Sequence, residues 1–229
     1  MKSLGIGFIV VTLALLAFST YQALFVAPTE QTMGDVQRIF YYHVPSAWVA
    51  GVCFFVNFVA SIVYLAKRSL NADALAAASA EVGVVFCTIV LITGPIWARP
   101  VWGIWWTWDA RLTTTLVLWL IYVSYLVLRR FAAGSQTQVL AAALGIFGFV
   151  DVPIVYMSIR WFRTQHPSPV MGGGANSGLD PAMLHAFLWN LLAFTCVGIV
   201  LIAARFRLQK MENQLEAKHT ELALHGGSR

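Results

Sequence analysis

The chain has 229 residues, of which 59% are hydrophobic and only 11% are charged. A soluble domain carries about a quarter charged residues, so a surface exposed mainly to water is excluded and a membrane protein is expected. The formal charge of +5 comes largely from basic residues beside apolar stretches, where they determine membrane orientation, and it does not indicate nucleic-acid binding.

Six apolar stretches are long enough to cross a hydrocarbon core of ~30 Å as helices. The first is too long for the apolar part of a signal peptide, so it is counted as a span. The sequence therefore predicts an all-α fold, a polytopic membrane bundle of six transmembrane helices, with spans at Leu4–Val26, Ala47–Ala66, Ala74–Trp97, Leu112–Leu128, Val139–Ile159 and Met183–Ala203. Residues 1–204 would form this membrane domain, and residues 205–229 a cytoplasmic C-terminal tail.

Lysine and arginine are distributed unequally between the two sides of the predicted bundle. One side has Lys2, the turns at 67–68 and 129–130, and the basic tail, whereas the other has five arginines: Arg38, Arg99, Arg111, Arg160 and Arg163. The positive-inside rule places the more basic side, with both termini, in the cytoplasm. Three longer loops then lie outside, at Ala27–Ser46, Ala98–Arg111 and Arg160–Ala182.

Two kinds of chemistry are not expected from this chain. The cysteines Cys53, Cys87 and Cys196 lie in apolar stretches and predict packing residues, and no CxxCH motif for covalent haem attachment occurs. No GxxxxGK[ST] motif for nucleotide phosphates occurs either. We therefore expect a protein that is not an enzyme, with any energy supplied by a partner.

The second outer loop is rich in tryptophan, and we call residues 97–111 the WWD loop. An interfacial aromatic belt would scatter tryptophans over both membrane interfaces, whereas these five form a compact block with Gly103, Asp109 and Arg111. Large aromatic faces stack well on planar conjugated rings, so the block predicts a platform for haem. Arginine forks suit haem propionates. The tryptophans are Trp97, Trp102, Trp105, Trp106 and Trp108.

Three histidines are predicted near the same outer face. His43 precedes the second span, His166 lies in the third outer loop, and His185 lies just inside the sixth span. Imidazole is a common axial ligand of haem iron. A single histidine at a helix mouth is usually only hydrogen-bonded, but two beside a tryptophan platform favour a ligand pair.

Two carboxylates fall inside predicted spans, where an unpaired charge is costly. Glu81 in the third span and Asp151 in the fifth, close to Pro153, are compatible with a substrate path, with a partner contact, or with a hydrogen bond that fixes helix packing.

Two further segments carry local signals. In the third outer loop, the glycine-rich stretch 172–178 predicts a mobile segment, and Asp180 followed by Pro181 predicts a helix start. In the tail, apolar residues at roughly heptad spacing suit either docking on a cytoplasmic partner or a solvated extension of the sixth helix. They are Leu208, Met211, Leu215 and Leu222.

Several motifs together resemble a known family. WGIWWTWDARLT at 102–113 is similar to the tryptophan-rich WWD motif of haem-handling proteins in cytochrome c maturation, and YYHVPSAW, DVPIVYMSIRWFRTQH and the DPAM segment resemble the CcmC (haem exporter protein C) family along nearly all six spans. The resemblance implies non-covalent, transient binding of haem b at the outer face of the inner membrane. It also implies presentation of that haem to the periplasmic chaperone CcmE, together with an ABC-type complex of CcmA, CcmB and CcmD.

The resemblance also implies specific haem ligands. The family's His-Val-Pro and Trp-Trp-x-x-x-His motifs correspond to His43 and His166, and give His185 no role. The sequence departs from the second motif at Phe162, where the family has tryptophan, and at Pro167, where it has glutamine. The residues implied to bind haem around the two ligands are Trp102, Gly103, Trp105, Trp106, Trp108, Asp109 and Arg111.

Two other functions remain as alternatives from the sequence. A b-type redox protein would place its histidines within spans on facing helices, whereas both predicted ligands lie at one face. A transporter that moves haem or another small molecule through its own bundle would use Glu81 and Asp151 as lining groups.

Overall fold

The structure is a computed structural model, and it describes residues 2–132, 136–167 and 178–226. These residues form helices and connecting loops, without a β-strand among them. Most of the glycine-rich stretch predicted to be mobile lies outside the described residues. The all-α fold is confirmed, and six helical segments are long and apolar enough to cross a membrane.

The helices follow one another along the chain, and the longest connection, residues 162–180, joins α6 to α7. A π-helical turn η1 continues α1, and a 3-10 turn η2 leads directly into α2. The bounds are α1 Lys2–Tyr21, η1 Gln22–Val26, η2 Asp35–Ile39, α2 Phe40–Lys67, α3 Leu70–Trp102, α4 Ala110–Phe131, α5 Thr137–Phe149, α6 Asp151–Trp161 and α7 Pro181–Gly226.

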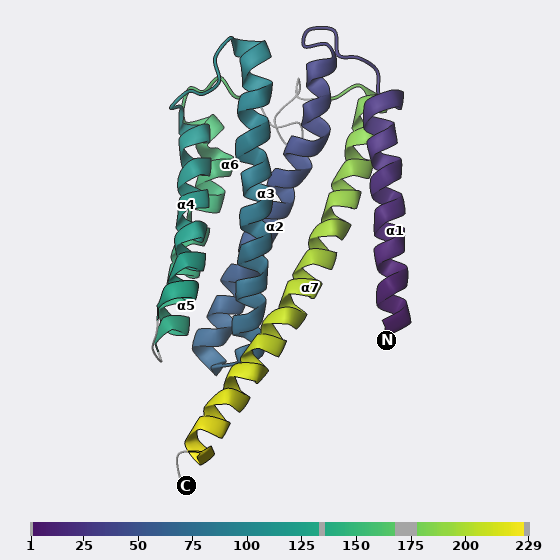
Figure 1. Cartoon of the computed structure of the whole chain (residues 1–229). Coiled ribbons are helices and arrows are strands. Elements are labelled where there is room, and N and C mark those ends of the chain that lie inside the picture. The colour runs from purple at the N-terminus through teal and green to yellow at the C-terminus, as the bar shows by residue number, and fades with distance from the viewer. Residues whose placement is uncertain (1, 133–135, 168–177, 227–229) are drawn as a thin grey trace.

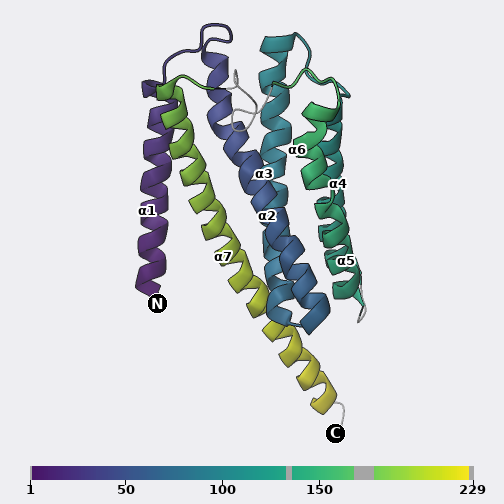
Figure 2. The same cartoon turned by 180° about the vertical axis from the view of Figure 1, so that it is seen from behind.

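The bundle has a central pair of helices, α2 and α3, with the other helices on either side of it (Figure 1). Helices α4, α5 and α6 lie on one side, whereas α7 crosses the other side obliquely and separates α1 from the pair (Figure 2). Both ends of the chain lie at the same end of the bundle. The opposite end, which carries the WWD loop, is called the WWD end below.

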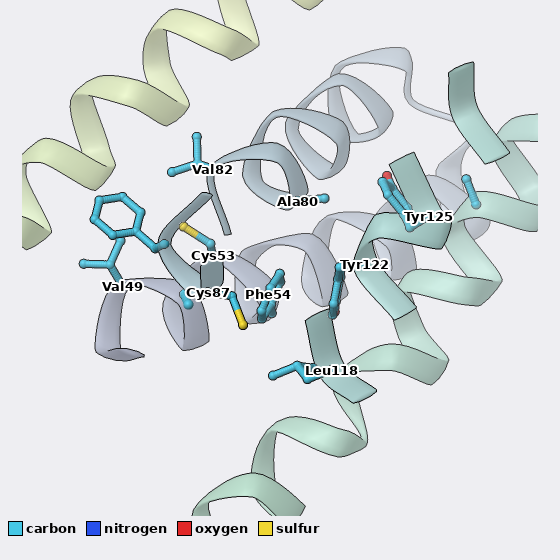
Figure 3. Close-up of a cluster of buried hydrophobic side chains, with 12 residues drawn as sticks. Val49, Cys53, Phe54, Ala80, Val82, Cys87, Leu118, Tyr122 and Tyr125 are labelled. Atoms are coloured by element: carbon cyan, nitrogen blue, oxygen red, sulfur yellow. The ribbon is translucent and has the colours of Figure 1, made fainter. Parts of the chain in front are cut away.

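The core of the bundle is made where α2, α3 and α4 meet (Figure 3). The rings of Phe54 and Tyr122 stack there with centroids 3.8 Å apart and planes 15° apart. A Cβ atom at Gly83 would lie 2.5 Å from the Phe54 ring, so glycine is required where α3 approaches α2. Cys53 and Cys87 are buried in this cluster, as expected of packing residues.

The second span begins earlier than the sequence suggested. We expected an outer loop as far as Ser46, but α2 begins at Phe40 and η2 precedes it. The prediction treated Pro45 as a helix start, although proline is tolerated inside membrane helices when neighbouring groups satisfy the freed backbone. His43 therefore lies within the first turn of α2, not in a loop.

The WWD loop is also shorter than predicted. Helix α3 continues past Pro95 and Pro100 to Trp102, so only residues 103–109 are non-helical. Gly103 ends α3 with a φ of 78°, a left-handed conformation that glycine adopts without strain, and its N–H donates to the carbonyl of Arg99 at 3.0 Å. Arg99 and Pro100 follow Trp97, and the backbone stays helical through both of them.

The fifth span consists of two helices. Helix α5 ends at Phe149 and α6 begins at Asp151, with Val150 between them. Pro153 explains the break, because it has no N–H to donate and its ring crowds the carbonyl of residue 149. Asp151 thus lies at the break, and its Oδ2 is buried without a hydrogen-bond partner among the described residues.

Two ion pairs join helices within the bundle. Arg205 of α7 donates through Nε and Nη2 to the carboxylate of Glu81 on α3, the second contact at 2.9 Å. Arg129 of α4 makes a bidentate pair with Asp73 of α3, at 2.6 and 2.9 Å. Glu81, which the sequence left open, therefore has a partner that neutralises it inside the bundle.

The last helix begins as predicted and is the longest of the helices. Asp180 accepts from the N–H of Ala182 at 2.8 Å, and Pro181 is the first helical residue. Helix α7 then continues without interruption past residue 205 to Gly226.

Candidate functional site

His43 lies on α2 near the WWD end, and its side chain contacts α3. Its side chain is buried, with 8% of the residue exposed, and its Nδ1 lies 2.8 Å from Oγ1 of Thr93. The indole of Trp97, one turn further along α3, meets the imidazole edge-on with centroids 5.8 Å apart. Thr93 and Trp97 are four residues apart and therefore share one face of α3.

His166 lies in the loop that follows α6. Its Nδ1 lies 3.0 Å from the carbonyl oxygen of Pro167. His166 is within electrostatic reach of His43, of Arg111 and of Asp109. Thus two histidines that are far apart in the sequence lie within electrostatic reach of each other and of the end of the WWD loop.

The surroundings of His166 favour the neutral form of its imidazole. Burial of the ring, followed by the nearby positive charge of Arg111, lowers its pKa from 6.5 to about 4, while the Pro167 carbonyl and Asp109 act in the opposite direction. The residue is half-buried by its accessible surface, and this burial is the main cause of the lowered pKa. A neutral imidazole is the form that binds a metal ion.

Asp109 is the N-cap of α4. Its Oδ1 accepts from the N–H of Leu112 at 3.0 Å, and its Oδ2 accepts from the hydroxyl of Thr107 at 3.2 Å. These bonds satisfy a free donor at the helix start and fix the last residues of the WWD loop. The sequence predicts Asp109 as a hydrogen-bond acceptor in the haem site. In the structure its carboxylate accepts from residues on either side of it and so holds the end of the WWD loop in place.

The tryptophans of the WWD loop have different environments. Trp105 and Trp108 are 59% and 76% exposed. Trp106 meets Trp108 edge-on, with centroids 5.6 Å apart. The indole nitrogens of Trp106 and Trp97 are buried without a hydrogen-bond partner among the described residues. The loop thus presents exposed aromatic faces, and two buried N–H donors remain free to pair with an acceptor.

Arg111 connects the WWD loop to α6. Its Nη1 donates to the main-chain carbonyl of Val155. Arg111 also lies within electrostatic reach of Asp109 and Tyr156. This arginine was predicted to bind haem, and in the structure it ties the first turn of α4 to the helix that leads to His166.

His185 does not join the other two histidines. It is exposed near the start of α7, and its Nε2 lies 3.1 Å from Nε1 of Trp189, one turn along the same helix. An indole nitrogen only donates, so this contact occupies the lone pair of His185 Nε2.

Sequence reasoning missed Thr93 and Trp97 as neighbours of His43. Trp97 was included only in the tryptophan block, and Thr93 was read as part of an apolar span. Their spacing of four residues was visible in the sequence, but it did not indicate which helix their shared face contacts. Only the packing of α2 against α3 supplies that information.

Known proteins similar to this chain were found along most of its length. A family model described as "Heme exporter protein C" matches residues 2–221. The chain is 36% identical over 208 residues to a protein named "Heme exporter protein C" from Bradyrhizobium diazoefficiens, covering 90% of this chain and 78% of that protein.

Two other relatives extend the similarity. The protein of the same name from Escherichia coli K12 is 35% identical over 194 residues, covering 82% of this chain and 74% of that protein. A "Putative cytochrome c biosynthesis ccmC-like mitochondrial protein" from Marchantia polymorpha is 31% identical over 189 residues, covering 82% and 80%. With this coverage and identity, the chain belongs to the haem exporter protein C (CcmC) family.

Proposed function

We propose that this chain is a haem-handling membrane protein of cytochrome c maturation. In this proposal it binds haem b non-covalently and transiently at the outer face of the inner membrane and presents it to the periplasmic chaperone CcmE. CcmA, CcmB and CcmD would be its partners in an ABC-type complex. The names of the relatives support haem handling in general, and the site supports the finer steps.

The observation that carries the proposal is the pairing of His43 with His166. The two histidines lie within electrostatic reach of each other, and neither Nε2 has a hydrogen-bond partner among the described residues. Each Nδ1, by contrast, contacts an oxygen atom at 2.8 or 3.0 Å. Two nitrogens that are otherwise uncommitted, beside one loop, suit the two axial positions of a haem iron.

The surroundings of the two histidines suit the rest of the haem. The exposed faces of Trp105 and Trp108 offer apolar surface for a conjugated ring. The unpaired indole N–H groups of Trp97 and Trp106 are donors that a propionate can satisfy. Because these two tryptophans are exposed, a haem bound against them would keep an edge accessible to the chaperone.

The arrangement of the helices and the positions of basic residues support the proposed membrane sidedness. The helix bundle places both termini at the end opposite the WWD loop, and the basic turns at 67–68 and 129–130 lie at that same end. The positive-inside rule favours a periplasmic location for the WWD end, where a periplasmic chaperone would have access to it.

The transporter alternative is less well supported than haem presentation. Glu81, one of the two carboxylates that would line a path, is engaged by Arg205. The b-type redox alternative is favoured by the position of His43 within α2, but His166 lies in a loop at the same end. His43 and His166 therefore do not form the arrangement of that alternative, in which histidines within facing helices hold haem inside the membrane.

Visible absorption of the purified protein, expressed with ample haem, tests the proposal. The wild type is expected to show a low-spin haem with two imidazole ligands, and His43→Ala or His166→Ala is expected to weaken or shift that spectrum. His185→Ala is the matched control and should leave it unchanged. A wild type without haem, or a spectrum that is the same in the His43 and His166 variants, would contradict the proposal.

A further inference from the structure

The contact between His43 and Thr93 has a definite direction. The Oγ1 of Thr93 lies 2.7 Å from the carbonyl oxygen of Ile89 and 2.8 Å from Nδ1 of His43. A hydroxyl has one hydrogen, and a carbonyl oxygen only accepts, so the hydroxyl donates to Ile89. Its lone pair must then accept from His43, which places a hydrogen on Nδ1.

Another threonine of α3, Thr88, makes the same pair of hydrogen bonds, and there the donor from the neighbouring helix is known. Thr88 donates to the carbonyl of Val84 at 2.7 Å and accepts from Nε1 of Trp119 at 2.8 Å. Indole nitrogen only donates, so this threonine shows that a hydroxyl bonded to its own helix accepts a ring N–H from a neighbouring helix. Thr93 and His43 repeat this geometry.

A neutral imidazole carries one N–H, so a hydrogen on Nδ1 leaves the lone pair on Nε2. We propose that Thr93 is a positioning residue, which holds His43 in the Nδ1–H tautomer and so commits Nε2 to the haem iron. This inference rests on the proposed haem-binding function. Thr93 would act on the haem site only through the ring of His43, since its other hydrogen bonds are to carbonyls of its own helix.

His166 reaches the same tautomer by a different route. Its Nδ1 lies 3.0 Å from the carbonyl of Pro167, which accepts and cannot donate. Both histidines therefore offer Nε2, but only His43 depends on a side-chain acceptor that a substitution can remove.

The expected consequence of losing Thr93 follows from the general role of such acceptors. An acceptor on the second ring nitrogen fixes the tautomer and orientation of a metal-binding histidine and makes the other nitrogen a stronger ligand. Replacing such acceptors lowers metal affinity by about 10- to 100-fold. Valine at position 93 has nearly the shape of threonine but no hydroxyl, so it removes the acceptor with little change in packing.

The experiment compares three variants with the wild type. Thr93→Val removes the acceptor, Thr93→Ser keeps a hydroxyl, and Thr88→Val is the matched control, because it removes an equivalent hydroxyl of α3 that accepts from Trp119. Solid-state NMR of 15N-histidine in haem-free protein in lipid bilayers reports which ring nitrogen is protonated. His43→Gln identifies the His43 signals. Haem titration and the reduction potential of the bound haem are measured on the same variants.

The inference predicts the Nδ1–H tautomer for His43 in the wild type, in Thr93→Ser and in Thr88→Val, and its loss or mixing with Nε2–H in Thr93→Val. Haem affinity should fall about 10- to 100-fold in Thr93→Val alone, and the reduction potential should rise as the ligand becomes a weaker donor. An Nε2–H tautomer in the wild type, or an unchanged tautomer in Thr93→Val, would overturn the inference. Because the tautomer is read without haem, this outcome is distinct from a wild type that binds no haem, which would overturn the proposed function instead.

Discussion

The guanidinium of Arg111 donates to the main-chain carbonyl of Val155, so the first turn of α4 is joined to α6. Helix α6 ends at Trp161, and His166 follows in the next loop. Arg111 therefore links the end of the WWD loop to the helix that leads to His166, in addition to the packing of α4 against α6.

We expect Arg111→Ala to weaken haem binding by moving His166 away from His43. A hydrogen bond to a charged group contributes about 1.5–3 kcal/mol, so the loss should be tenfold or more in affinity. Haem titration of the purified protein measures it. Arg163→Ala is the control, because Arg163 is an exposed arginine in the same loop after α6 as His166. An equal loss in both variants would indicate that general positive charge, and not the contact with Val155, is what matters.

The pKa of His166 gives a second prediction. It lies at about 4, chiefly because the ring is buried, so the imidazole should stay neutral from pH 7 down to about pH 5. Since an unfolded histidine takes up a proton near pH 6.5, the folded state should lose stability as the pH falls from 6.5 towards 4.

A titration of the His166 ring by 15N NMR in haem-free protein measures this pKa directly. Arg111→Ala should raise it, because the nearby positive charge is removed. A midpoint near 6.5 in the wild type would show that the ring is not buried as described.

Asp109 is expected to act as a helix cap. Asparagine offers the same side-chain oxygen to the N–H of Leu112, so Asp109→Asn should retain the thermal midpoint and haem affinity of the wild type. Asp109→Ala should lower the free energy of unfolding by about 1 kcal/mol. Thermal unfolding in detergent and haem titration check both. Loss of haem binding in Asp109→Asn at unchanged stability would assign a role to the negative charge instead.

Trp108 should contribute to haem binding without contributing to stability. It is 76% exposed, so Trp108→Ala removes little buried surface from the protein. An aromatic pair contributes about 0.5–1.5 kcal/mol beyond buried area, so haem affinity should fall several-fold, and Trp108→Phe should restore part of it. Phe131→Ala is the control, because that ring is 79% exposed at the other end of the bundle. Wild-type affinity in Trp108→Ala would remove this residue from the site.

The ion pair between Glu81 and Arg205 separates haem presentation from transport through the bundle. Glu81→Gln should lower the free energy of unfolding by roughly 1–2 kcal/mol, with haem affinity unchanged. In the double variant Glu81→Gln with Arg205→Gln, the loss of unfolding free energy should be smaller than the sum of the losses in the two single variants, because the two groups are coupled. Thermal unfolding and haem titration of the four proteins measure this. Cytochrome c maturation lost in Glu81→Gln at unchanged stability would favour the transporter.

The sequence predicted those parts of the fold that depend on local composition. Six apolar stretches gave six spans, and Asp180 with Pro181 marked the start of α7 correctly. The helix ends near Pro45 and Pro100 were wrong, because proline usually ends a helix in water but is tolerated in membrane helices. The break at Val150 was missed for the opposite reason, since hydropathy does not detect an interruption within an apolar run.

The candidate site was predictable only in part. The histidines and tryptophans were visible as residue types and as a motif, but the partners that orient them lie on other helices. Thr93 is an ordinary residue of an apolar stretch until α2 packs against α3 and brings His43 to it. Likewise, nothing in the sequence indicates that Arg111 reaches Val155, because that contact depends on where α6 lies after the break.

The most direct test of the central claim, that His43 and His166 ligate one haem, is rescue of glycine variants by free imidazole. Low-temperature EPR of the ferric protein should show one low-spin, two-imidazole signal in the wild type. His43→Gly and His166→Gly should each lose it, and added imidazole should restore it in each, because the missing ligand is replaced in the space left behind. A low-spin signal that persists in either variant without imidazole would contradict the account, since the iron would then have a different axial ligand.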